Sequence, residues 1–320
     1  MLTRSGRIVG KHSRGRVHKR RSLVRDAPIS SSSTTVLVGD VHGQSGKLAS
    51  LFRNLSSKLG RERFHAARVI FLGDLCDRGP NTSAVLSFVA GLSSTYPDME
   101  VKLLAGNHDL AMSLFLGLVD HDSGGKVPDG WSNSRRREPP LWVDDTGGDA
   151  HVEMHLQGRR WGGSAEGVEN AFNSEATFMS FGVAPGDRAG LLAAMPDSHK
   201  TLLSSLEFVV EIEGVVDDHN SEVDTILAVH AGLESDSPLE GQMAGLRRRL
   251  VDRKWLEPLQ GRSNVLASPP DTPNNVLIVS GHHGMVKIEP NRVILDSCGG
   301  YDDRPLAALV FPERLLVEGE

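Results

Sequence analysis

Five short polar segments follow apolar runs along this 320-residue chain, and each places Asp, His or Asn beside glycine. They are Gly39-Asp40-Val41-His42-Gly43, Gly73-Asp74-Leu75-Cys76-Asp77-Arg78-Gly79, Gly106-Asn107-His108-Asp109, His230-Ala231-Gly232 and Gly281-His282-His283-Gly284. One segment alone could be an ordinary turn or helix cap, so the prediction rests on their joint occurrence. Imidazole, carboxylate and amide ligands without thiolates suit Mn, Fe or Zn in a reactive centre. Two ions about 3.5–4 Å apart share an anionic bridge, for which Asp74 is the candidate.

The elements that position these segments alternate between strand and helix. Apolar, β-branched runs predict strands over residues 35–38, 68–72 and 100–104. Helical spacing of apolar residues predicts helices over residues 45–59, 81–96 and 110–118. Three strand–loop–helix units in succession predict an α/β fold. Ligands of open α/β sheets bind outside the carboxyl ends of the strands, which is where the polar segments stand.

A long insert near residues 119–175 interrupts this alternation and is rich in Gly, Asp, Ser and Arg. A loop of that length within a compact domain is usually functional or mobile. After it, the sequence predicts short helices near residues 187–194 and 198–206. Strands are then predicted over residues 207–213, 225–229, 276–280, 292–295 and 306–311.

The formal charge of −6 is unevenly distributed. Residues 1–34 carry nine Lys or Arg and one acid, whereas the remainder holds 26 of the 35 basic and 40 of the 41 acidic residues, a balance of −14. This division predicts a basic, disordered tail over residues 1–34 and a folded domain over residues 35–320, which contains the five polar segments. The acidic body argues against a nucleic-acid partner, and the lack of a long apolar run argues against a membrane span.

The basic tail leaves three interpretations open. It lacks the apolar core of a secretory signal, and its Arg- and Ser-rich composition fits an organellar transit peptide, a nuclear-localisation patch or a solvated tail. Two cysteines in the whole chain argue against a disulfide-stapled secreted scaffold. We therefore predict a cytoplasmic or nuclear protein, with organellar targeting as the alternative. The oligomeric state is left open.

Taken in order, the five segments resemble the calcineurin-like metallophosphoesterases, specifically the phosphoprotein phosphatase branch. The similarity runs from residue 36 to about residue 311. Within that branch the chain looks most like the plant Rhizobiales-like phosphatases, which act on phosphotyrosine. Residues 155–161 and the Gly281–Gly284 ending carry this finer resemblance. The resemblance implies a four-layer α/β/β/α sandwich.

The resemblance also implies a role for each motif residue. The first metal would be held by Asp40 and His42, and the second by Asn107, His230 and His282, with Asp74 bridging both. His108 would be the general acid, oriented by Asp77, and Arg78 and Asn107 would bind phosphate. The implied cofactors are two divalent ions per chain, Mn²⁺ first, with Fe or Zn as alternatives. His283 could replace His282 as a ligand, but the Gly-His order favours His282.

The family pattern usually has a second phosphate-binding arginine between the two late histidine segments. Arg262 follows Gly261 in a predicted loop and is preferred to the other candidates there, which are Arg247, Arg248, Arg249 and Arg253. From the insert, Arg159 and Arg160 are predicted to bind substrate, and the Gln157–Trp161 region is predicted to line the substrate entrance. The alternatives are surface salt bridges for the two arginines and an anchoring role for Trp161.

Departures from the serine/threonine members of the branch bear on the substrate. Asp109 stands where they carry Glu, Ala231 where they carry Gly, and Ser297 where they carry an active-site tyrosine. We therefore predict a phosphatase for phosphotyrosine-containing proteins, in which a hydroxide between two cations attacks phosphorus directly and neither cysteine is catalytic. The alternatives are a dinucleoside-polyphosphate hydrolase and a non-catalytic binding module. Every predicted ligand position is filled, which favours an enzyme.

Overall fold

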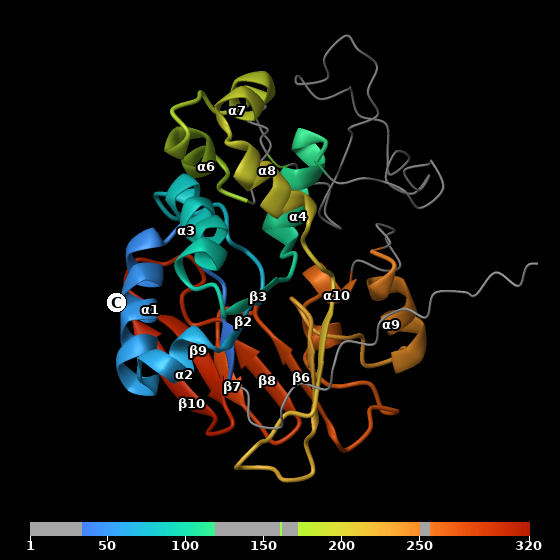
Figure 1. Ribbon diagram of the computed structural model, residues 1–320. Coiled ribbons are helices and arrows are strands. Elements are labelled where there is room, and N and C mark those ends of the chain that lie inside the picture. The colour runs from blue at the N-terminus through green and yellow to red at the C-terminus, as the bar shows by residue number, and fades with distance from the viewer. Residues whose placement is uncertain (1–33, 119–160, 162–171, 250–256) are drawn as a thin grey trace, which may run out of the picture. The chain divides into compact units, whose positions relative to one another are not determined.

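The computed structural model describes residues 34–118, 161, 172–249 and 257–320, which all fall within the compact unit Ser31–Glu320. Within these ranges the chain forms two mixed five-stranded sheets (Figure 1). The first has the order β10-β9-β1-β2-β3, built from Leu315–Gly319, Leu306–Phe311, Thr35–Val38, Arg68–Phe71 and Glu100–Leu103. The second has the order β4-β5-β6-β8-β7, built from Val210–Glu213, Thr225–Ala228, Val276–Ser280, Arg292–Leu295 and Val286–Ile288.

Helices connect and cover these strands. Before the insert they are α1 (Ser45–Leu59), α2 (Arg61–His65), α3 (Thr82–Thr95) and α4 (Asn107–Leu116). After it come α6 (Glu175–Ser180), α7 (Arg188–Ala194), α8 (Asp197–Ser204), α9 (Leu239–Arg247) and α10 (Glu257–Gln260). Helix α1 buries one apolar face, made of Leu48, Leu51, Phe52 and Leu55. No helix among the described residues is long and apolar enough to cross a bilayer.

The two sheets pack face to face because alternate strand residues point to opposite sides. Leu37, Ile70 and Leu277 belong to the apolar layer between the sheets, whereas Val36 and Val38 point to the other side and pack in the cluster that includes α1. Strands buried on both faces read as continuous apolar runs, which is why they could be predicted. The α/β class and the layered sandwich of two sheets with helices are confirmed.

Two boundaries near the site differ from the prediction. Helix α4 begins at Asn107 rather than residue 110, because Gly106 is its N-cap and its backbone N–H donates to the Asp109 carboxylate. The third segment is therefore the first turn of a helix. Strand β4 begins at Val210, and Glu207 instead forms an isolated bridge with Leu104. The short strands β7 and β10 were not predicted.

The layer between the sheets should dominate the stability of the fold. Leu37 lies on the central strand β1 and is fully buried, whereas Leu315 on β10 is 37% exposed. We expect Leu37→Ala to lower the free energy of unfolding by about 2–5 kcal/mol, since it leaves a cavity between two packed sheets. Leu315→Ala is the matched control and should cost much less. Equal losses in urea titrations of the two variants would contradict this packing.

Candidate active site

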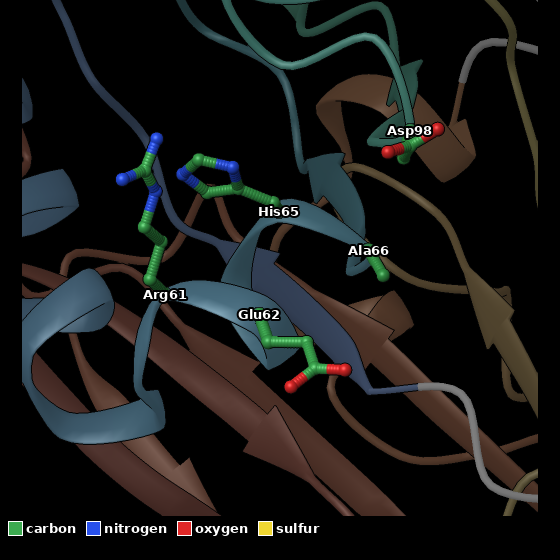
Figure 2. A pocket seen from close by; sticks show the side chains of 5 residues that line it. All are labelled: Arg61, Glu62, His65, Ala66 and Asp98. Atoms are coloured by element: carbon green, nitrogen blue, oxygen red, sulfur yellow. The ribbon is translucent and has the colours of Figure 1, made fainter.

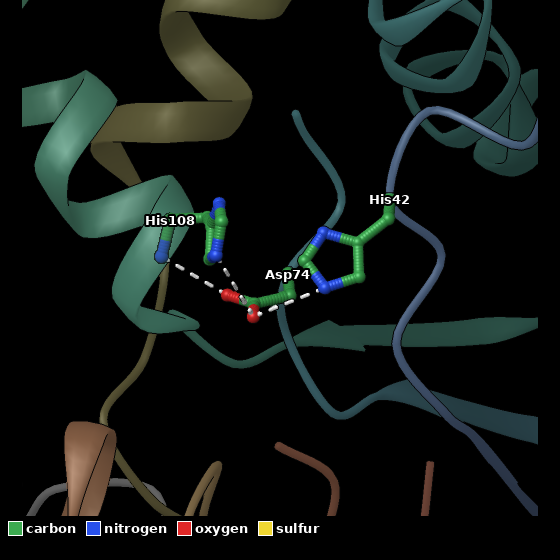
Figure 3. A group of neighbouring side chains, drawn as sticks. All are labelled: His42, Asp74 and His108. Atoms are coloured by element: carbon green, nitrogen blue, oxygen red, sulfur yellow. Dashed lines mark hydrogen bonds and ion pairs between the residues drawn. The ribbon is translucent and has the colours of Figure 1, made fainter. Parts of the chain in front are cut away.

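The carboxyl ends of strands from both sheets bring the five polar segments together. Strands β1, β2, β3, β5 and β6 lead respectively to Asp40 and His42, Asp74, Asn107 and His108, His230, and His282. All seven of these side chains are buried. Figure 3 shows the Asp74 carboxylate between the imidazoles of His42 and His108. Residues up to 242 positions apart thus share one centre, as the motif spacing predicted.

Asp74 is the most connected group of this centre. Its Oδ1 accepts the backbone N–H of His108 at 3.0 Å, and its Oδ2 lies 3.5 Å from His42 Nε2 and 3.4 Å from His230 Nε2. Burial by itself would raise the pKa of this carboxyl, but His230 and His108 hold it well below its usual value. Burial opposes a charge on His230, whereas Asp74 raises the pKa of that imidazole. A permanently ionised carboxylate is what a shared metal ligand requires.

Two groups of donor atoms are close enough to hold cations. His42, Asp74 and His108 offer ligand atoms within 4.8 Å of one another, and so do Asp74, His230 and His282. Asp74 belongs to both groups, as a bridging ligand would. Each group contributes imidazole and carboxylate donors, a set that suits Mn, Fe or Zn.

Two buried polar atoms beside these groups support the same interpretation. Asp40 Oδ2 accepts the backbone N–H of His282 at 2.9 Å, but Asp40 Oδ1 and His282 Nε2 have no hydrogen-bond partner among the described residues. Buried polar atoms without a partner are costly, and a bound ion is one explanation for them. Burial, Asp296 and Asp74 also raise the pKa of Asp40 well above its usual value. These residues therefore fit the two divalent cations that the sequence predicted.

The donor groups differ in one respect from the predicted ligand sets. In the described structure Asp40 belongs to neither group, whereas His108, the predicted acid, belongs to the first. Asn107 is placed as expected, with its Oδ1 3.4 Å from His230 Nε2. His283 points elsewhere, because its Nε2 lies 2.7 Å from the carbonyl oxygen of Ala231. That contact favours His282 over His283 at the second group.

The loops that carry the site adopt uncommon backbone conformations. Five non-glycine residues there have left-handed φ angles: His42 (45°), Asp74 (51°), Asp77 (70°), Arg78 (61°) and His282 (70°). Such conformations are strained and persist only where surrounding structure enforces them, as at functional sites. Neighbouring glycines allow the close approach, since a Cβ at Gly106 or Gly281 would overlap the carboxylate of Asp74 or Asp40.

His108 is held between a carboxylate and a guanidinium. Its Nδ1 lies 2.8 Å from Asp77 Oδ2, and its Nε2 lies 3.2 Å from Arg78 Nη2. Because an arginine can only donate, Nε2 is the acceptor and the proton of the neutral imidazole sits on Nδ1. Burial and then Arg78 lower the pKa of His108 to about 3, against the opposing field of Asp74. An acid role therefore requires Nε2 to gain a proton during the reaction.

The two arginines predicted to bind phosphate lie at this centre. Arg78 Nη1 donates to the carbonyl of Gly299 at 2.9 Å and contacts His42 Nε2 at 3.0 Å. Arg262 Nη1 donates to the carbonyl of His282 at 2.8 Å. Burial, His230 and Arg262 lower the pKa of His282 well below its usual value, so the charge of Arg262 is felt inside the site.

Two of the other candidate arginines make contacts away from this centre. Arg247 forms an ion pair with Glu211 at 2.7 Å, and Arg249 donates to the carbonyl of Ser204 at 3.0 Å. Arg159, Arg160 and Arg253 lie outside the described residues, so their predicted and alternative roles remain predictions.

The prediction that the Gln157–Trp161 region lines the substrate entrance is wrong for Trp161, whereas residues 157–160 lie outside the described residues. The Trp161 ring is 2% exposed, packs against Phe115 and Phe178 at 5.0 and 5.3 Å between centroids, and donates its indole N–H to Asp77 Oδ2 at 2.7 Å. The anchoring alternative is the one that the structure supports. Thr177, which donates to Asp77 Oδ1 at 2.6 Å, was missed altogether. No spacing in the sequence points to it.

Two further residues near the site have clear structural roles. Asp109 accepts the backbone N–H of Leu75 at 2.8 Å and so ties the second segment to the third. Ser297, at the position of the family tyrosine, donates to the carbonyl of Pro305 at 2.6 Å. These contacts explain both residues without a contact to substrate.

A separate surface pocket lies between α2 and the loop before β3 (Figure 2). Its lining is Arg61, Glu62, His65, Ala66 and Asp98. These residues precede β2 and β3, so they stand at the amino ends of strands whose carboxyl ends carry the site. The pocket holds none of the five polar segments.

A known family is similar to part of the chain. Residues 33–175 match the family model for calcineurin-like phosphoesterases, and this stretch includes the first three polar segments. The layered fold and the paired donor groups agree with this similarity.

Curated relatives are similar over a limited stretch. A symmetrical bis(5'-nucleosyl)-tetraphosphatase from Enterobacter sp. is 31% identical over 121 residues, which is 35% of this chain and 39% of the relative. The enzyme of the same name from Proteus mirabilis is 34% identical over 125 residues, or 35% and 40% of the two chains. The matches thus span about two fifths of these relatives.

Solved structures resemble the chain at low sequence identity. A cold-active protein-tyrosine phosphatase of a psychrophilic Shewanella has a TM-score of 0.45 at 16% identity, over 89% of this chain and 77% of that one. A protein serine/threonine phosphatase from Saccharomyces cerevisiae has a TM-score of 0.44 at 17% identity, over 88% and 74%. Similarity at this level carries no argument about substrate.

Asp74 should be indispensable for binding both cations. We expect Asp74→Asn to abolish turnover and to lower the bound Mn²⁺ per chain, because both donor groups lose their shared anionic oxygen. Metal content after dialysis and titration calorimetry measure this. Asp98→Asn in the surface pocket removes one carboxylate elsewhere and is the matched control. Two tightly bound ions in Asp74→Asn would show that Asp74 is not the bridge.

Proposed function

We propose that this protein is a metal-dependent phosphatase that hydrolyses phosphate monoesters, with phosphotyrosine in proteins as its substrate. The observation that carries the proposal is the shared carboxylate of Asp74 between two cation-sized donor groups, with Arg78 and His108 against the same centre. We further propose that it belongs to the phosphoprotein phosphatase branch, near the Rhizobiales-like subtype. A cytoplasmic or nuclear location remains part of the proposal.

The chain's own residues would divide the reaction among them. The two donor groups that share Asp74 would hold divalent cations, which would supply Lewis-acid activation of the phosphate and of the attacking water. The planar guanidinium of Arg78 offers paired donors to phosphate oxygens, and Arg262 adds a second positive charge at the rim. His108 would pass a proton from Nε2 to the departing oxygen, while Asp77 keeps the proton on Nδ1.

The charge of the site supports a monoester more than a polyphosphate. Among the described residues, Arg78 and Arg262 are the side-chain cations that act on several of the buried site groups. The phosphate of one tyrosine can be matched by these two arginines and the bound cations. Tyrosine is also a good leaving group, with a pKa of about 10, which lightens the task of the acid.

An aromatic side chain at the rim supports the choice of phosphotyrosine. The exposed ring of Tyr301 lies 3.3 Å from the position a Cβ would take on Gly299, whose carbonyl accepts from Arg78. Arg304 covers this ring at 4.7 Å. We propose that Tyr301, rather than the buried Trp161, contacts the phenyl ring of the substrate.

A dinucleoside-tetraphosphate hydrolase is the second candidate. It is favoured by the curated relatives of that name, which are 31% and 34% identical over about 120 residues. A non-catalytic binding module is not favoured, because all the predicted metal-binding side chains are present and buried together.

The substrate assignment can be tested with a panel. The Mn²⁺-loaded protein should hydrolyse a phosphotyrosine peptide with a kcat/KM at least about tenfold above phosphoserine and phosphothreonine peptides and diadenosine tetraphosphate. A preference for diadenosine tetraphosphate would establish the second candidate instead. The Asp74→Asn variant is the inactive control, because any activity in that sample comes from contaminating phosphatases.

The role of His108 predicts a dependence on the leaving group. We expect His108→Asn to slow hydrolysis of phosphotyrosine by about 10²–10⁴-fold, and to slow p-nitrophenyl phosphate much less, because its phenol needs little protonation. Steady-state kinetics on both substrates measure this. Equal losses on the two substrates would mean that His108 acts as a metal ligand, as its place in the first donor group also allows.

A further inference from the structure

The carboxylate of Asp77 makes three side-chain contacts, and both of its oxygens take part. Its Oδ1 accepts the Thr177 hydroxyl at 2.6 Å, and its Oδ2 accepts the Trp161 indole N–H at 2.7 Å and lies 2.8 Å from His108 Nδ1. All four side chains are buried. Only one of these contacts, the one to His108, belongs to the predicted acid pair.

We propose that Trp161 and Thr177 are positioning residues for the acid pair: they fix the Asp77 carboxylate so that His108 keeps a proton on Nδ1 and directs Nε2 to the leaving group. The inference rests on the proposed phosphatase function. Neither residue touches the substrate, and both act through Asp77.

The hydroxyl network around Thr177 fixes the direction of its hydrogen bond. Thr177 Oγ1 accepts the backbone N–H of Asp77 at 3.1 Å and lies 2.9 Å from Thr82 Oγ1. With its proton given to Asp77 Oδ1, Thr177 can accept from both of these groups through its two lone pairs. Thr177 therefore holds the backbone and the side chain of Asp77 together, at a residue whose φ is 70°.

The indole of Trp161 restrains the Asp77 carboxylate through its other oxygen, Oδ2. An indole N–H can only donate, so it cannot exchange roles with the carboxylate, and its ring is locked between Phe115 and Phe178. Trp161 comes from the insert between α4 and α6, and Thr177 lies on α6. Asp77 and His108, which belong to the second and third polar segments, are thus restrained by residues that follow these segments in the sequence.

The proton balance shows why the position of Asp77 matters. As the phosphorus–oxygen bond of the ester breaks, the departing oxygen takes the proton of His108 Nε2 and leaves as a neutral phenol. His108 remains neutral with its proton on Nδ1, which is the tautomer that its contacts with Asp77 and Arg78 define. The proton that Nε2 passes on comes from the attacking water within the same catalytic cycle, and the hydroxide that remains of that water forms the new bond to phosphorus. A mobile Asp77 would let the proton move to the wrong nitrogen.

Leaving-group kinetics separate this role from a general loss of structure. Trp161→Phe keeps an aromatic ring but removes the donor, and Thr177→Val keeps the shape but removes the hydroxyl. We expect each to lower kcat on a phosphotyrosine peptide by about tenfold, with little change for p-nitrophenyl phosphate, KM or Mn²⁺ affinity. His108→Asn combined with Trp161→Phe should be no slower than His108→Asn alone, because both changes disable the same step.

Phe178→Leu is the control, because it loosens the packing of Trp161 but keeps the indole donor. It should lower the melting temperature without changing the ratio of the two rates. If Phe178→Leu reproduces the kinetic effect, or if Trp161→Phe slows both substrates equally, the two residues are merely structural and the proposal is overturned.

A spectroscopic readout does not depend on activity. In ¹⁵N-histidine spectra, the resonance pair that His108→Asn removes should show the neutral tautomer protonated on Nδ1. The double variant Trp161→Phe, Thr177→Val should shift it towards a mixture of tautomers. An unchanged single tautomer would overturn the positioning role even if the wild-type protein proved inactive on monoesters, so failure of the two proposals can be distinguished.

Discussion

A carboxylate buried as completely as that of Asp74 needs donors or positive charges around it, because water cannot supply them. The chain meets this need with the imidazole of His230, whose pKa the carboxylate raises, and with the backbone N–H of His108. These groups come from different strand ends of two sheets, so the carboxylate can be satisfied only when both sheets are packed together. Folding and assembly of the site are therefore one event, and the pair of donor groups that share Asp74 follows from it.

The loops around that carboxylate have strained backbone conformations. Asp74, Asp77 and Arg78 all have left-handed φ angles within five residues, and His42 and His282 repeat the feature on other loops. Such conformations cost of order 1–3 kcal/mol each, so they need a rigid frame. The apolar layer between the sheets supplies this frame, and so does the buried hydrogen bond from the Leu75 backbone N–H to the Asp109 carboxylate. The side chains of these loops are thereby held so that they converge on the centre around Asp74.

Sequence patterns predicted most of the frame and the membership of the site, because strands buried on both faces give continuous apolar runs and the polar segments follow them. The contacts of Asp77 could not be predicted, since Trp161 and Thr177 lie 84 and 100 residues away without a periodic signal. The exposed edge strand β7 was missed for lack of buried residues. Helix α4 begins three residues before the predicted start because Gly106 and the Asp109 carboxylate form its N-terminal cap. The spacing of apolar residues carries no information about such a cap.

The central claim is that one carboxylate joins two cation sites. Crystals of the Mn²⁺-loaded protein, measured at the manganese absorption edge, test this claim most directly. We predict two anomalous peaks about 3.5–4 Å apart, with Asp74 between them and His230 and His282 beside one of them. A single peak, or two peaks without Asp74 between them, would contradict this account.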